Sequence, residues 1–239
     1  HAEGYLKRLV TDLYFINPPA LSKLRGYSAG LPLSVISRDI PSGVLYRLLL
    51  SRTEMQTWPH LRAAETIAAR TCQAARDADV VYGFDTALLP AMDRLQRQDA
   101  MIVMEQCIAP RSIFRSSVET LSDKLLEAGI NPADSGLLDG MAYYDLMSAI
   151  EQEEWSNADR IYCAAPFVRD TLVAKGVASK KIRVVPYGIS LPNNLALRER
   201  ATTGQPRVVF GGAFSWRKGA LEFGKLAMAL KGAARFEAF

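Results

Sequence analysis

The chain has 239 residues, of which 49% are hydrophobic and 23% are charged, and these proportions exclude an intrinsically disordered protein. The formal net charge of +4 suits phosphorylated ligands or an anionic membrane surface, but it is equally typical of a charge that only keeps a protein soluble. No apolar run approaches the roughly 20 residues of a membrane-spanning helix, so an integral membrane protein is not predicted.

The first predicted element is a helix over residues 5–14, where apolar side chains recur at helical spacing. The segment that follows, to Gly43, is rich in Pro and Gly and is predicted as loops with one short strand at 34–37. Helices are then predicted at 60–79, 86–99, 117–158 (with a loop at 129–136) and 166–176, and strands at 80–84, 100–106, 160–165 and 181–188. Short strands that are apolar on both faces and alternate with helices indicate an α/β fold, with helices covering a parallel sheet.

A polar segment at residues 189–206, with Pro, Asn and Gly near its ends, interrupts this alternation and is predicted to be an interdomain linker. It would separate a Rossmann-like domain at residues 1–188 from the start of a second one at 207–239. In the second segment, a strand at 207–210 leads through a loop into an amphipathic helix at 220–230. One such unit cannot bury a core alone, so the second domain is predicted to be only begun.

The loop between that strand and that helix reads "GGAFSWRKG" and has the features of an anion site. Gly211 and Gly212 have no side chain to hold a phosphate away from the backbone, and a helix N-terminus attracts negative charge. Arg217 and Lys218 add two cations. The loop is neither a P-loop nor a G-x-G-x-x-G fingerprint. It favours a diphosphate site, and the alternative is a solvated turn whose basic pair keeps the helix end soluble.

The preceding stretch, "EQEEWSNADRIYCAAPFVRDTLVAKGVASKKIRVVPYGIS", gives this loop a context. A glutamate-bearing helix ends in Ala158-Asp159, a strand and a helix ending in Gly176 follow, and a second strand closes with Pro-Tyr-Gly before the linker. In this order the pieces resemble the family 4 glycosyltransferases, which are retaining enzymes of the two-domain GT-B fold. The resemblance is most specific over residues 151–230 and weaker over 72–106.

The resemblance implies an N-terminal domain that holds much of the acceptor site and lacks its first strand here, and a C-terminal domain that binds a nucleotide sugar. It implies that Lys218 contacts the donor diphosphate. The family's Gly-Arg pair falls on Gly212 and Ala213, so one expected arginine is missing, and Arg217 is its candidate replacement. The paired glutamates of the family belong beyond Phe239. The catalytic residues are therefore unknown, and we expect the chain itself to be an inactive fragment.

Further candidate ligand contacts come from position alone. Glu105 and Gln106 end a predicted buried strand, where open α/β sheets bind ligands, so they are candidate sugar or acceptor contacts. Trp216 is a candidate for stacking on a sugar, and the family resemblance makes His1 a candidate acceptor contact. The alternative interpretation is that Glu105 and Gln106 only end the strand, that Trp216 packs against its neighbours, and that His1 is only a terminal residue. His60 is interpreted as a residue of a loop or helix start rather than a base.

The remaining ionisable residues predict no metal site. Glu151, Glu153 and Glu154 are interpreted as the solvated face of a helix, with an acid/base cluster as the alternative. The three cysteines, Cys72, Cys107 and Cys163, are widely spaced in apolar surroundings, which is typical of reduced thiols in a cytosolic protein. With only two histidines, no metal-ligand spacing is present.

The resemblance implies a glycosyltransferase of the hexosyltransferase type, which moves a sugar from a nucleotide-diphosphate-sugar to an unknown sugar, lipid or small-molecule acceptor with retention. The donor is a co-substrate, and no cofactor or metal is expected. Two alternatives stay open: a non-catalytic GT-B-like binding or regulatory module, and another GT-B sugar-phosphate enzyme, such as an epimerase or phosphorylase. Scattered basic residues argue against nucleic acid. The predicted location is the cytoplasm, with peripheral association at the inner face of the membrane as a second interpretation.

Overall fold

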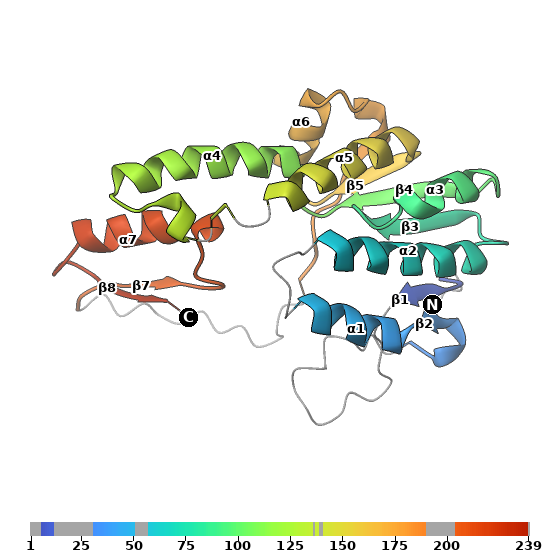
Figure 1. The fold of residues 1–239 in the computed structure, drawn as a ribbon, viewed down its shortest axis with the longest axis horizontal. Helices are drawn as coiled ribbons and strands as arrows, with labels where there is room; N and C mark the ends of the chain where they lie inside the picture. The colour runs from blue at the N-terminus through green and yellow to red at the C-terminus, as the bar shows by residue number, and fades with distance from the viewer. Residues whose placement is uncertain are drawn as a thin grey trace. The chain divides into compact units, whose positions relative to one another are not determined.

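The computed structural model describes residues 6–11, 31–50, 57–135, 137–138, 141–189 and 204–238 (Figure 1). The chain divides into two compact units. Unit 1 comprises residues 1–114 and 140–187, and unit 2 comprises residues 115–139 and 188–239. Most of the predicted linker lies outside the described residues, and the assignment of an acceptor domain, a linker and a donor domain stays a prediction.

Unit 1 is built around a four-stranded parallel sheet. Its strands, in spatial order, are β3 (Val80–Phe84), β4 (Met101–Gln106), β5 (Arg160–Cys163) and β6 (Ile182–Val184). The sequence predicted all four strands, and the α/β class with a parallel sheet is confirmed. The register pairs Phe84 with Glu105 and Gln106 with Cys163, so the carboxyl ends of neighbouring strands lie together at one edge.

Helices cover one face of this sheet. They are α2 (Thr57–Ala74), α3 (Leu89–Gln96), α5 (Met141–Asn157) and α6 (Pro166–Ala174), as predicted apart from their ends (Figure 1). Buried side chains from these helices and from all four strands form one core, which includes Cys72, Met92, Ile102, Trp155, Ile161, Leu172 and Ile182. Val81 of β3 joins this core, whereas Val80 and Tyr82 are each 50% exposed. The sequence predicted that both faces of the strands are buried. In β3, however, successive side chains point alternately to the face covered by helices and to an exposed face. None of the described helices is long and apolar enough to cross a membrane.

The N-terminal part of unit 1 differs from the prediction. Residues Leu9–Thr11, inside the predicted helix, form strand β1, which pairs in parallel with β2 (Ile36–Arg38). The helix prediction is wrong at these residues, because a short apolar run fits a helical stripe and a strand equally well. The short strand predicted at 34–37 is confirmed in part: residues 36 and 37 belong to β2, whereas 34 and 35 belong to the 3-10 turn Leu33–Val35.

Helix α1 (Ile40–Leu50) was not predicted, although its start carries a local signal. Asp39 Oδ1 accepts a hydrogen bond from the backbone N of Ser42 at 3.2 Å, and Pro41 lies in the first turn. Arg70 of α2 pairs with Asp39 at 3.0 Å. An acidic cap followed by proline was therefore present in a segment that its Pro and Gly content had marked as loop.

Unit 2 contains a parallel β-α-β unit. Strand β7 (Arg207–Phe210) leads to α7 (Ala220–Ala229), after which β8 (Arg235–Ala238) lies beside β7. The sequence predicted β7 and α7 but not β8. Edge-to-face contacts join four phenylalanines across the unit: Phe210, Phe214, Phe223 and Phe236. The C-terminal part of α4 (Arg111–Glu127) also belongs to unit 2, where Lys124 pairs with Glu222 at 3.5 Å.

Candidate functional site

Polar residues gather at the carboxyl edge of the sheet in unit 1. Glu105 and Gln106 end β4, and Asp85 directly follows β3. The backbone N of Asp85 donates to the carbonyl of Glu105 at 2.9 Å, and its Oδ1 accepts from the backbone N of Cys107 at 3.1 Å. A side chain at Gly83 would come within 2.6 Å of Leu88, so glycine lets the chain turn tightly after β3. These bonds place both acidic residues at the edge that the sequence had singled out.

Arg111, at the start of α4, joins two carboxylates from different segments. Its Nη1 contacts Asp85 Oδ2 and Glu151 Oε1, and the three side chains are 12%, 4% and 0% exposed. The backbone N of Arg111 also donates to Glu151 Oε2 at 2.8 Å. Burial acts to lower the pKa of the guanidinium, but the charges and hydrogen bonds of Asp85 and Glu151 outweigh it, and the pKa is raised. Arg111 is thus a fixed cation whose charge is already compensated.

Gln106 is fully buried behind this ion pair. Its Nε2 donates to Glu151 Oε1 at 2.8 Å, and its Oε1 accepts from Trp155 Nε1 at 2.8 Å. Both ends of the amide are therefore occupied within the chain. We assign Gln106 to orienting Glu151 and Trp155, because in this arrangement it presents no surface to a ligand. The same bonds account for the packing of Trp155 in the core.

Glu105 faces the open side of the sheet between two tyrosines. Its Oε2 accepts from the hydroxyl of Tyr82, and its Oε1 accepts from the hydroxyl of Tyr187, the residue at the end of unit 1. Burial and Glu105 raise the pKa of Tyr82, and the hydrogen bond to Glu105 raises that of Tyr187. Burial, and then Asp85, raise the pKa of the Cys107 thiol to about 12. All three groups are protonated at neutral pH, so none of them adds a negative charge beside Glu105.

His60 lies in the first turn of α2, as the sequence indicated. Its Nδ1 is 2.8 Å from the hydroxyl of Tyr46 on α1, and its ring centroid is 4.9 Å from that of Tyr143 on α5. Burial, and then the positive charge of Arg111, lower the pKa of His60. The imidazole is therefore neutral at pH 7 and held by aromatic neighbours beside the Arg111 ion pair. The sequence gave no sign of this grouping.

Two of the three glutamates on α5 are not solvated, so the predicted solvated face is wrong for them. Glu151 and Glu154 are both 0% exposed, whereas Glu153 is exposed as expected. Glu154 accepts hydrogen bonds from the backbone N of Thr86, Leu88 and Leu89 at 2.6, 2.9 and 2.9 Å. It therefore caps the N-terminus of α3 from another helix. Burial raises its pKa to about 7 against these donors.

The predicted diphosphate loop lies in unit 2, between β7 and α7. Gly212 has φ +116° and Gly219, the N-cap of α7, has φ +92°, a region that favours glycine. A side chain at Gly211 or Gly212 would meet nothing within 4 Å, and both lie exposed. Lys218 is also exposed. The loop therefore offers open backbone at Gly211 and Gly212 and an exposed lysine in the 3-10 turn Trp216–Lys218. The backbone N–H groups of Lys218, Gly219 and Ala220 donate within this turn.

The other predicted contacts have different surroundings. Trp216 is half-buried, and its Nε1 donates to the carbonyl of Ser135 at 2.9 Å. This bond ties the loop to the 3-10 turn Pro132–Ser135 within unit 2. The side chain of Arg217 and the whole of His1 lie outside the described part of the chain. Their roles, and that of Trp216, stay predictions.

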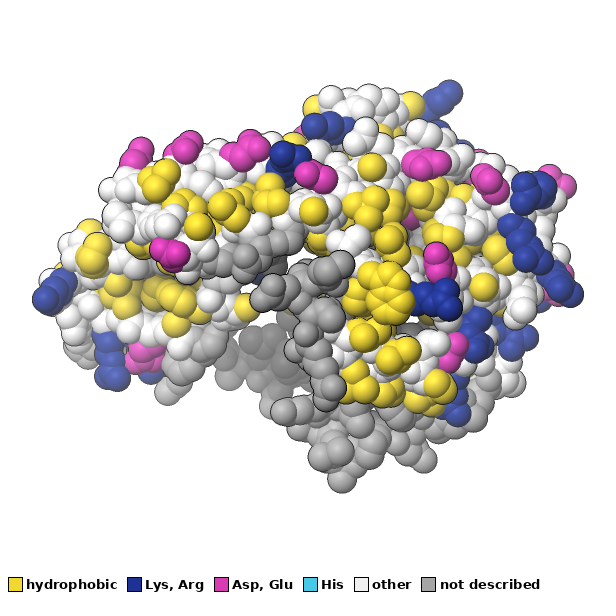
Figure 2. Space-filling model, viewed as in Figure 1, with side chains coloured by type: hydrophobic (Ala, Val, Ile, Leu, Met, Phe, Trp, Pro, Cys, Tyr) yellow, Lys and Arg dark blue, Asp and Glu magenta, His cyan; other side chains and the backbone are white. Residues whose placement is uncertain are grey.

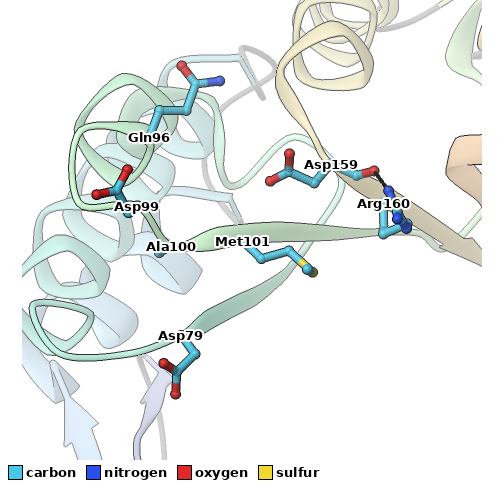
Figure 3. Close-up of a pocket in the computed structure, with 7 residues that line it drawn as sticks. All are labelled: Asp79, Gln96, Asp99, Ala100, Met101, Asp159 and Arg160. Carbon is cyan, nitrogen blue, oxygen red and sulfur yellow. Dashed lines mark hydrogen bonds between the residues drawn. The ribbon is translucent and has the colours of Figure 1, made fainter.

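A surface hollow of about 570 Å³ lies at the opposite, amino-terminal edge of the sheet (Figure 3). It is lined by Asp79, Gln96, Asp99, Ala100, Met101, Asp159 and Arg160. Asp159 Oδ2 already accepts from the backbone N of Ile102 at 2.8 Å, and the three aspartates do not converge. No group of three metal-ligating side chains occurs among the residues that the structure describes. We therefore place the candidate chemistry at the carboxyl edge and in the glycine loop.

Comparisons with known proteins assign neither a family nor an activity to this chain. No protein-family profile matches the chain, and no curated protein sequence matches it. Among solved structures, the chain is similar to the glycotransferase of kitacinnamycin, with 13% sequence identity and a TM-score of 0.42 over 85% of this chain. This chain spans 57% of the length of that protein. At this level of similarity, the fold assignment rests on the parallel sheet and its helices.

Proposed function

We propose that the protein is a glycosyltransferase that takes its sugar from a nucleoside-diphosphate-sugar. The observation that carries this proposal is the loop from Gly211 to Gly219, with exposed backbone, exposed Lys218 and a helix start in sequence. A diphosphate gains from all three, because backbone N–H groups and the helix terminus bind its oxygens and a lysine pairs with its charge.

The proposed role of the loop follows from the place where negative charge develops during sugar transfer. As the bond between the sugar and the diphosphate breaks, negative charge grows on the leaving diphosphate, and fixed cations and N–H groups aimed at it lower the barrier. Lys218 and the backbone at Gly211 and Gly212 would supply this stabilisation, with Arg217 as a second cation. These groups do the work that a metal ion does in other transferases. The carboxyl edge of unit 1 would hold the acceptor.

Substitution of Lys218 by alanine tests the location of the donor site. Loss of one charge-assisted contact is worth roughly 1.5–3 kcal/mol, so we expect the affinity for the preferred nucleotide among UDP, GDP and ADP to fall about 10- to 150-fold in calorimetric titrations. Lys225→Ala is the matched control, because Lys225 is an exposed lysine on α7, the helix that follows the loop. Equal affinities for the two variants would place the diphosphate elsewhere.

A further inference from the structure

The carboxyl edge of unit 1 has a local charge opposite to that of the whole chain. The chain carries a formal +4, but this edge brings together Asp85, Glu105 and Glu151 with Arg111 as their cation, which leaves a formal excess of two negative charges. The guanidinium is already shared by Asp85 and Glu151. A phosphate or carboxylate arriving here would be repelled by this excess of negative charge.

The helices beside this edge present a largely apolar surface. Figure 2 shows hydrophobic side chains gathered over α1 and the start of α2, and exposed apolar residues there include Val44, Leu45, Leu48 and Trp58. Two arginines lie on the same helices: Arg47 of α1 donates from Nη1 to the carbonyl of Gly43 at 3.0 Å, and Arg62 of α2 pairs with Glu65 at 3.1 Å.

His60 supplies a hydrogen-bonding group at this edge. Its Nδ1 is taken by the Tyr46 hydroxyl, while Nε2 has no partner among the described residues and is not a buried atom. The Tyr143 ring packs against the imidazole at 4.9 Å, and Tyr143 lies at 5.4 Å from Tyr144, which contacts Phe114 at 4.5 Å. The ring is fixed on one side and open at the other nitrogen.

We propose that the carboxyl edge of unit 1 binds an uncharged acceptor that carries hydroxyl groups, and that His60 Nε2 hydrogen-bonds one of these hydroxyls. That this ligand is the acceptor rests on the proposed function. The class of ligand, an uncharged molecule with hydroxyl groups, rests on the local charges and on the geometry of His60. Carboxylates accept hydrogen bonds from sugar or alcohol hydroxyls, and the aromatic rings offer apolar faces to a sugar ring or an aromatic group. A phosphorylated acceptor is disfavoured.

The test uses the imidazole itself as the probe. The protein is labelled with ¹⁵N-histidine, and its ring signals are followed by NMR during titration with phenyl β-D-glucopyranoside or with its 6-phosphate. The chain contains only two histidines, so the signals that disappear in His60→Gln are those of His60. We expect the uncharged glucoside to shift the His60 Nε2 signal saturably, and we expect the affinity for the phosphate to be at least about tenfold lower.

The variant Glu105→Gln tests whether negative charge at the edge causes the preference. It removes one negative charge from the edge, so we expect the preference for the uncharged glucoside to shrink severalfold. Absence of a His60 shift with either glucoside, or equal or tighter binding of the phosphate, overturns the inference. Nucleotide titration of the same sample reports on the loop in unit 2, so failure at His60 with intact nucleotide binding leaves the proposed function standing.

Discussion

Replacing Arg111 by methionine is expected to lower the free energy of unfolding by about 3–5 kcal/mol, because Asp85 and Glu151 would be left as buried, unpaired charges. The backbone bond from Arg111 N to Glu151 would persist, so the loss isolates the guanidinium. Urea unfolding followed by circular dichroism measures it. Arg169→Met is the matched control: Arg169 is 43% exposed and pairs only with its neighbour Asp170, so its loss should cost less than about 1 kcal/mol.

A double substitution separates charge from packing in this prediction. If the cost arises from unpaired charge, Arg111→Met combined with Glu151→Leu should cost clearly less than the sum of the single changes, because the second change removes one of the stranded carboxylates. Additive losses would show that Arg111 acts through its packing alone. A loss below about 1 kcal/mol for Arg111→Met would contradict the ion-pair account.

The second large effect is a pH dependence carried by Glu154. Its pKa is raised from 4.5 to about 7 in the folded chain, so between these pH values the folded state holds a proton that the unfolded state has lost. Stability therefore falls as pH rises through this window and is level above it. A shift of this size corresponds to about 3 kcal/mol.

The comparison of the wild type with Glu154→Gln at pH 5 and pH 8 measures this contribution. The glutamine does not titrate, so the stability advantage of the wild type should shrink by up to about 3 kcal/mol between the two conditions. Glu153→Gln is the control, because Glu153 is exposed on the same helix. An advantage that grows with pH would mean that the three N–H donors at the start of α3 outweigh burial and hold Glu154 ionised.

Local patterns were enough to predict the sheet and one part of the site. The four strands of the central sheet of unit 1 alternate with helices, and the position of Glu105 at the end of a strand follows from that alternation alone. The glycine loop before α7 could also be located, because its residues are consecutive, and its role as a diphosphate site stays a prediction. Where one short segment carries the signal, the sequence is informative.

The ion-pair network could not be predicted in the same way. Asp85, Arg111 and Glu151 come from segments 26 and 40 residues apart, and no local pattern brings them together. One signal was available: Glu151 and Glu154 are separated by three residues, so they share a helix face with the buried Trp155. Weighing that spacing against the general preference of glutamate for solvent would have placed both carboxylates inside.

The central claim is that the chain recognises the diphosphate of a nucleotide sugar, and the most direct measurement compares each nucleoside diphosphate with its monophosphate by calorimetric titration. We expect one of UDP, GDP or ADP to bind the chain at a single site at least about tenfold more tightly than the corresponding monophosphate, since the second phosphate adds a charge-assisted contact. If the folded chain binds none of them, or binds monophosphate and diphosphate equally, the donor-site account is contradicted.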